Sequence, residues 1–264
     1  MTSRSNLLTI VAVAAGLLIS MPAQSGTTSD AIDDQKGPAD ATNVMATLQA
    51  ACDNDNGNAC TALAVKGCDS GCAESCKFAA SRFRFAQDSR TDLRRAAELF
   101  IKGCNLGDGA QCAAAADLQD VQTSSKALAL FRKGCDLGNR PACEDAATYL
   151  YMEATELVDS GLARLAYQYA TRVCTQNDAA AEPYCKQVAD SLIDGFGVAA
   201  NETKGEQMLK DLCQSHPDGG ACSDLGQRYL NGDGVYPSTV DARAVVASGC
   251  DAGDSSSCSL LALL

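Results

Sequence analysis

Large aromatic side chains and histidine are scarce in this 264-residue sequence. It contains no tryptophan, only 13 phenylalanine and tyrosine residues, and a single histidine, His216. So few aromatic rings cannot fill one large hydrophobic core, and favour many small contacts between alanine-lined helices. With one histidine and no C-x2-C pair, a zinc site is not expected, and no metal or cofactor is assigned.

Basic side chains are also in deficit. The chain has 21 lysine and arginine residues against 33 aspartate and glutamate residues, which gives a formal net charge of −12. Nucleic acids and anionic membrane surfaces attract lysine and arginine. The sequence therefore predicts no nucleic-acid partner and no stable membrane insertion, and favours a soluble protein.

The first 25 residues are typical of a signal peptide. Arg4 precedes an apolar stretch over 7–19, and Ala23 and Ser25 suit the positions before a signal-peptidase cleavage site ahead of Gly26. The apolar stretch is short for a membrane span, although an uncleaved N-terminal anchor stays open as the alternative. We expect a periplasmic or secreted protein, in which residues 26–40 form an acidic, disordered lead-in.

Fourteen of the 15 cysteines fall into seven pairs, and in five of these pairs the two members are eight positions apart. Export makes oxidised cysteine plausible, so each pair is interpreted as a disulfide. The expected pairs are Cys52–Cys60, Cys68–Cys76, Cys104–Cys112, Cys135–Cys143, Cys174–Cys185, Cys213–Cys222 and Cys250–Cys258.

The residues around the pairs repeat as well. A small residue lies eight positions before the first cysteine and a large one five before it, which is a helical stripe. Another small residue lies four positions after the second cysteine, where a second helix would be crossed by its neighbour. Glycine follows the first cysteine by three positions in four copies, where a helix would end. These glycines are Gly71, Gly107, Gly138 and Gly253.

This pattern predicts helical hairpins, joined by disulfides and stacked over residues 41–264. From Cys68 onward the first cysteines are spaced by 36, 31, 39, 39 and 37 residues, which are helical-hairpin repeat lengths. Cys52 and Cys68 are only 16 residues apart. Residues 41–75 are therefore expected to form an irregular N-terminal cap with one short helix over 61–66.

Two segments resemble the Sel-one-like repeat, a relative of the tetratricopeptide repeat. They are Leu225-Gly-Gln-Arg-Tyr-Leu-Asn-Gly-Asp-Gly-Val235, followed by Ala242, and Ala189 to Val198 with its Gly-Phe-Gly-Val end. With the cysteine hairpins, the chain is similar to the exported cysteine-rich proteins of Helicobacter. The resemblance implies an all-α, right-handed α/α solenoid of disulfide-stapled helical hairpins, and a scaffold that binds a protein or peptide.

The same resemblance implies an alternative function, since some of these cysteine-rich proteins are credited with penicillin binding and weak β-lactam hydrolysis. The ligand would then be a β-lactam or a peptidoglycan-like small molecule. A serine β-lactamase needs Ser-x-x-Lys, which is absent, and Thr123-Ser-Ser-Lys126 only approximates it in an expected interhelical loop. No catalytic residue is assigned, and the choice between scaffold and β-lactamase-type hydrolase stays open.

Two further sets of residues are candidate sites. Cys72 has no pairing partner and is either an intermolecular bridge, a reactive thiol, an incidental residue, or part of a shuffled Cys68–Cys72 pair. Four tyrosines within one repeat could line a groove, or could pack between helices. They are Tyr149, Tyr151, Tyr167 and Tyr169.

Overall fold

A computed structural model describes residues 50, 53–54, 57–85, 92–118, 124–175 and 178–264. The chain divides into two units, 1–41 and 42–264, and every element below belongs to the second. The expected signal peptide, the lead-in over 26–40, Cys52 of the pair Cys52–Cys60, and Thr123 lie outside the described residues.

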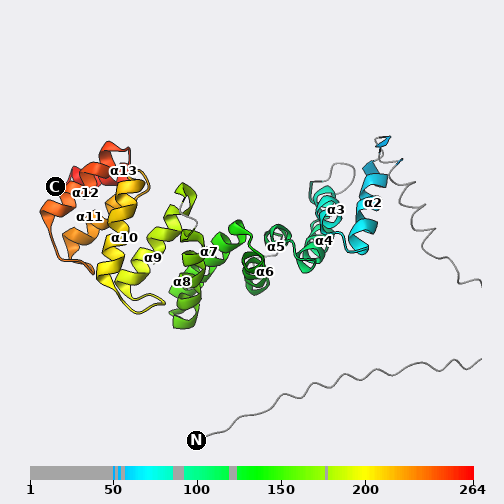
Figure 1. The fold of residues 1–264 in the computed structure, drawn as a ribbon, viewed down its shortest axis with the longest axis horizontal. Coiled ribbons are helices and arrows are strands. Elements are labelled where there is room, and N and C mark those ends of the chain that lie inside the picture. The colour runs from blue at the N-terminus through cyan, green and yellow to red at the C-terminus, as the bar shows by residue number, and fades with distance from the viewer. Residues whose placement is uncertain (1–49, 51–52, 55–56, 86–91, 119–123, 176–177) are drawn as a thin grey trace, which may run out of the picture. The chain divides into compact units, whose positions relative to one another are not determined.

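The described residues form twelve α-helices and no strand (Figure 1). Their bounds are α2 Gly57–Asp69, α3 Ala73–Phe85, α4 Leu93–Asn105, α5 Gly109–Ala116, α6 Ser124–Asp136, α7 Arg140–Leu157, α8 Ser160–Cys174, α9 Glu182–Asp194, α10 Glu202–Ser215, α11 Ala221–Asn231, α12 Thr239–Asp251 and α13 Ser255–Leu261. A 3-10 turn, η2 Ala179–Ala181, precedes α9.

Each helix packs chiefly on the next one in the chain, from α2 against α3 to α12 against α13. The buried side chains form three clusters in series, and neighbouring clusters share a helix: α5 contributes to the first and second, and α9 to the second and third. Such nearest-neighbour packing defines a solenoid of helical hairpins. The predicted all-α solenoid is confirmed.

Six of the expected cysteine pairs are bonded in the structure, with Cα–Cα distances of 4.4–4.7 Å. Each bond joins one helix, at or near its end, to the first turns of the next. Cys104 near the end of α4 and Cys112 in α5 are both fully buried. The disulfides therefore belong to the core as much as the apolar side chains do.

The turn inside three of the four described eight-residue pairs is built in the same way. Gly107, Gly138 and Gly253 have φ values of 99°, 83° and 100°, in the left-handed region that favours glycine. The next residue then caps the following helix: the Asp108 carboxylate, for example, accepts hydrogen bonds from two backbone N–H groups of α5. The predicted helix ends at these glycines are confirmed, and the caps start the next helix, so the chain reverses direction within the turn.

The small residues predicted at helix crossings are buried, with one exception. Ala80, Ala147 and Ala189, which follow a second cysteine, have no exposed surface. Ala96 and Ala242, on helices that end near a first cysteine, have none either. Ala262 is exposed because it follows α13, which packs on α11 and α12 with no later described helix to cover it.

The expectation of a single short helix over 61–66 is wrong. α2 runs from Gly57 to Asp69 and has 13 residues, as many as α4. The Thr61 hydroxyl donates to the Gly57 carbonyl, so the helix begins a turn earlier. It ends only where Gly71 takes a φ of 91°. Ser124–Lys126 also differ from expectation, since they form the start of α6 instead of a loop.

We predict that Gly134→Ala destabilises the solenoid. A Cβ at Gly134 in α6 would lie 2.7 Å from the Ala142 Cβ and 2.9 Å from the Gly109 carbonyl oxygen. Overpacking should lower the free energy of unfolding by about 1–3 kcal/mol, which outweighs the better helix propensity of alanine. Urea unfolding measures this, with Gly161→Ala as the control, at a half-buried position of α8 where an added Cβ would have only the Asp159 carboxylate oxygen, at 3.0 Å, within 4 Å. Equal stability of the two variants would contradict the close approach of α5, α6 and α7.

Candidate functional site

A groove of about 470 Å³ lies between α2, the end of α3 and the start of α4, and we call it the α2–α4 groove. Its volume is in the range of ligand-binding pockets. It is lined by Asn58, Thr61, Ala62, Val65, Lys66, Asp69, Arg82, Phe83 and Arg95. The lining combines an apolar part with three basic side chains, which is unusual in so acidic a chain.

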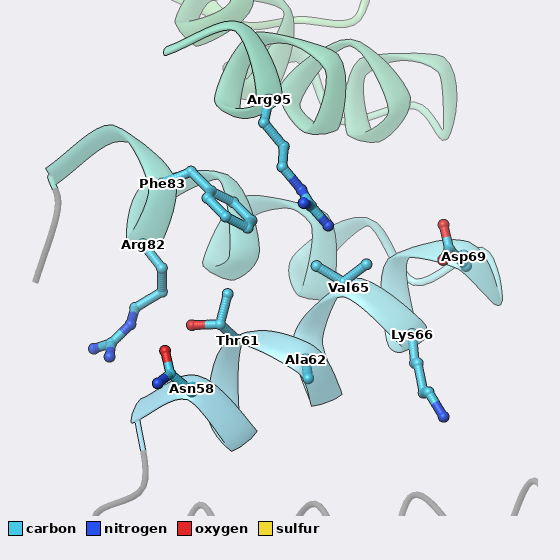
Figure 2. A pocket seen from close by; sticks show the side chains of 9 residues that line it. All are labelled: Asn58, Thr61, Ala62, Val65, Lys66, Asp69, Arg82, Phe83 and Arg95. Carbon is cyan, nitrogen blue, oxygen red and sulfur yellow. The ribbon is translucent and has the colours of Figure 1, made fainter. Parts of the chain in front are cut away.

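Figure 2 shows Arg95 reaching from α4 toward Val65 on α2, with the Phe83 ring of α3 beside the same space. The Arg95 guanidinium carbon lies 4.6 Å from the centre of the Phe83 ring, within the range of a cation–π contact. The Asp92 carboxylate accepts from the Arg95 backbone N–H at 2.9 Å and so caps α4. The cap places Arg95 in the first turn, at the mouth of the groove.

A ladder of polar contacts joins successive even-numbered helices, from α2 to α8. A cation two residues before one first cysteine contacts the Asp or Asn that follows the preceding first cysteine. The contacts are Lys102–Asp69 at 2.6 Å, Lys133–Asn105 at 2.6 Å and Arg172–Asp136 at 2.6 Å. Asp69 is therefore already neutralised by Lys102. Lys66 holds the same position before Cys68, but no described carboxylate lies within ion-pair distance of it.

The groove lies in a basic part of an acidic chain. Residues 57–105 contain eight basic and five acidic side chains, whereas residues 106–264 contain eleven basic and 22 acidic side chains. The formal charges are thus +3 and −11 for the two stretches. An anionic ligand is attracted to the first stretch and repelled by the second.

A second depression of about 500 Å³ adjoins the groove. It shares Val65, Asp69 and Arg95 with the α2–α4 groove and continues along α4 past Glu98 to Lys102. The two depressions together follow α2 and α4 for several turns. This arrangement can hold an extended chain as well as a compact molecule.

A half-buried charge cluster joins α9 to α11. The Lys186 ammonium lies 2.9 Å from Asp190 and 3.3 Å from Asp224, and the Arg228 guanidinium lies 3.1 Å from Asp190. Arg228 also contacts Asp194 at 2.9 Å. Because these five groups pair with one another across adjacent repeats, the cluster is explained as a structural contact.

Burial, together with the adjacent Asp224 carboxylate, raises the pKa of Asp190 to about 6. Burial acts on Asp224 in the same direction, but the hydrogen bond with Asp190 and the charges of Lys186 and Arg228 prevail and lower the pKa of Asp224. The two neighbouring carboxylates therefore have different pKa values, raised for Asp190 and lowered for Asp224.

The four tyrosines have different environments. Tyr169 is 5% exposed within the core and accepts a hydrogen bond from Arg132, and Tyr167 is half-buried against the same core. Tyr149 and Tyr151 are exposed, and their rings pair with Phe131 and Phe196 at 5.4 and 5.2 Å. Tyr169 is therefore a packing residue, and a groove lined by these tyrosines stays a hypothesis for the other three.

Cys72 lies in the exposed turn between α2 and α3 and is a free thiol. Hydrogen bonds from the side chain and backbone of Ser75 lower the pKa of the Cys72 thiol. Cys68 is bonded to Cys76, so the alternative Cys68–Cys72 pairing is not the one in this structure.

Sequence comparisons gave no match, either to a protein-family model or to a curated protein. Solved structures do resemble the chain. A Sel1 repeat protein from Oxalobacter formigenes superposes with a TM-score of 0.54 and 11% identity, over 81% of this chain and 84% of that chain. The chain therefore has the Sel1-repeat fold, the Sel-one-like architecture that the motifs indicate.

Two other solved structures are similar at lower scores. One is a protective antigen of uropathogenic Escherichia coli strains that displays an SLR fold, with a TM-score of 0.35, 16% identity, and coverage of 77% of this chain and 51% of that chain. The other is a Sel1 repeat protein from Klebsiella pneumoniae, with a TM-score of 0.37, 18% identity, and coverage of 76% and 97%.

The sequence interpretation missed the α2–α4 groove. Its residues come from three helices and match no motif, so only the structure brings Val65, Phe83 and Arg95 together. One signal was available, because the local excess of basic residues over 57–105 is visible in the sequence. The total charge of −12 conceals it.

We predict that the charge cluster makes stability fall as pH rises from about 4 to 6. The folded protein keeps a proton on Asp190 in this window, whereas the unfolded chain, with an aspartate pKa near 3.9, releases it. Asp190→Asn should reduce this fall by about 1–2 kcal/mol, after allowance for solvent screening. Urea midpoints at pH 4.5 and 6.5 measure it, with Asp251→Asn as the exposed control. The same pH slope in wild type and Asp190→Asn would refute the assignment.

We predict that alkylation of the native, unreduced protein modifies Cys72 among the described cysteines. Its thiol is exposed and free, whereas the other described cysteines are in disulfides. Peptide mass spectrometry after iodoacetamide treatment locates the label, and Cys72→Ser is the control. A label on Cys68 or Cys76 would mean that the disulfides at the first turn are shuffled.

Proposed function

We propose that the protein is an exported repeat scaffold that binds a polypeptide partner through the α2–α4 groove. The observation that carries this proposal is the groove itself, where apolar and basic side chains from three helices line one open space. Apart from Asp69 in the Cys68–Cys76 loop and Asn58 in the expected Cys52–Cys60 loop, these residues lie outside the loops that the disulfides close. The groove is thus available for a partner while the stack stays intact.

The fold supports a binding role. In a solenoid each repeat contacts only its neighbours, so long helical surfaces stay available for other molecules. Peptides commonly bind such proteins in grooves between helices, where side-chain pockets give specificity. The two adjoining depressions along α2 and α4 offer such a surface.

Export is part of the proposal. Six disulfides within the described residues suit an oxidising compartment, and the N-terminal sequence supports cleavage near Ser25 and Gly26. None of the described helices is long and apolar enough to cross a membrane. We infer a mature chain that begins with the acidic segment 26–40, continues with the cap over 41–75, and functions in the periplasm or outside the cell.

No observation favours the alternative β-lactam function. Lys126 is exposed on α6, and Thr123 of the same segment lies outside the described residues. The hypothesis therefore depends on the family resemblance alone, and the binding scaffold is the function that we adopt.

Site-specific photo-cross-linking tests the proposal. A photo-reactive amino acid at Ala62, which is exposed in the groove, should give a discrete cross-linked polypeptide in the native cell envelope. The matched control is Ser259, exposed on α13 and remote from the groove in the sequence. Products of equal yield from both positions, or none from Ala62, would count against a partner in the groove.

A further inference from the structure

We propose that the α2–α4 groove recognises an acidic peptide in which a carboxylate side chain lies next to an apolar one. This inference depends on the proposed function, since it names the chemistry of the polypeptide partner. It is carried by the charge and the geometry of three residues, Lys66, Phe83 and Arg95.

Two cations of the groove lack an acidic partner among the described residues. Lys77 is 3.2 Å from Glu74 and Lys102 is 2.6 Å from Asp69, so these neighbouring charges are matched internally. No described carboxylate is paired with the ammonium of Lys66 or the guanidinium of Arg95. Their charges are therefore available to an incoming carboxylate.

Arg95 is held beside the apolar part of the groove. Its guanidinium carbon lies 4.6 Å from the centre of the Phe83 ring, and this cation–π contact limits where the group can move. A guanidinium can donate two parallel hydrogen bonds to a planar carboxylate, a geometry that lysine does not offer.

The groove also offers apolar surface beside the cations. Val65 and Phe83 are half-buried and Ala62 is exposed, and all three line the same space. Figure 2 shows Val65 directly below Arg95, so an apolar side chain resting on Val65 would lie close to the guanidinium. A ligand that matches both features has a carboxylate and an apolar group on neighbouring residues.

Acidic groups at the edge of the groove disfavour a polyanion. Asp92 and Glu98 line the adjoining depression, and the stretch 106–264 has a formal charge of −11. A nucleic acid or a row of lipid phosphates would bring several negative charges close to these groups. A single carboxylate between apolar neighbours avoids them, which favours the peptide.

Fluorescence anisotropy with defined probes tests the inference on the oxidised, signal-free chain. The probe is a fluorescein-labelled peptide of alternating glutamate and leucine. The first comparison probe has glutamine in place of glutamate, the second has serine in place of leucine, and the third is a labelled single-stranded oligonucleotide. The glutamate–leucine peptide should bind tightest, and added salt should weaken it.

Two variants that each reverse one positive charge, one inside the groove and one outside it, test where the peptide binds. Arg95→Glu should weaken binding of the glutamate–leucine peptide by about tenfold, and Arg95→Lys by a smaller factor, because lysine keeps the charge without the planar fork. Arg243→Glu, on an exposed arginine of α12, should leave affinity within about twofold. Circular dichroism confirms that all variants fold.

Three outcomes would overturn the inference: equal losses for Arg95→Glu and Arg243→Glu, equal binding of the glutamine peptide, or stronger binding of the oligonucleotide. If Ala62 still cross-links specifically, the groove binds a partner of other chemistry, and only this inference fails. If Ala62 does not cross-link either, the proposed function fails with it.

Discussion

The short disulfide between one helix end and the next helix start is the constraint on which the rest of the structure depends. It holds two Cα atoms 4.4–4.7 Å apart, so consecutive helices must reverse within a few residues. A bridge over eight residues stabilises the fold by about 2.5 kcal/mol on the chain-entropy model. With so little aromatic surface to bury, the stack gains much of its stability from these closures and from close contacts at alanine and glycine.

The architecture could be predicted because its causes are local. The disulfide spacing, the glycine at each helix end and the small residues at crossings all act within a dozen positions, and the structure agrees at Cys104–Cys112, Gly107 and Ala80. The length of α2 was not predicted correctly, because the second cysteine of a pair does not open its helix but lies three residues into it, as Cys60 does in α2 and Cys112 in α5.

The groove was beyond sequence reasoning for a different reason. Whether a side chain binds or packs depends on what the next helix places opposite it. Tyr169 is turned into the core, whereas Arg95 lies over Phe83 at an open edge, and nothing in their local sequence distinguishes the two cases. Pairing also distinguishes charges at the same repeat position: Lys102 forms an ion pair with Asp69 within the stack, whereas Lys66 has no paired carboxylate among the described residues.

The ladder Lys102–Asp69, Lys133–Asn105 and Arg172–Asp136 has a consequence for how such a chain can change in length. In each contact the later unit supplies the cation and the earlier unit supplies the oxygen acceptor. Any two of these units can therefore form the same contact. Loss or duplication of an internal unit would still leave matching surfaces at the junction. The stack can therefore vary in extent over evolutionary time while the α2–α4 groove stays unchanged.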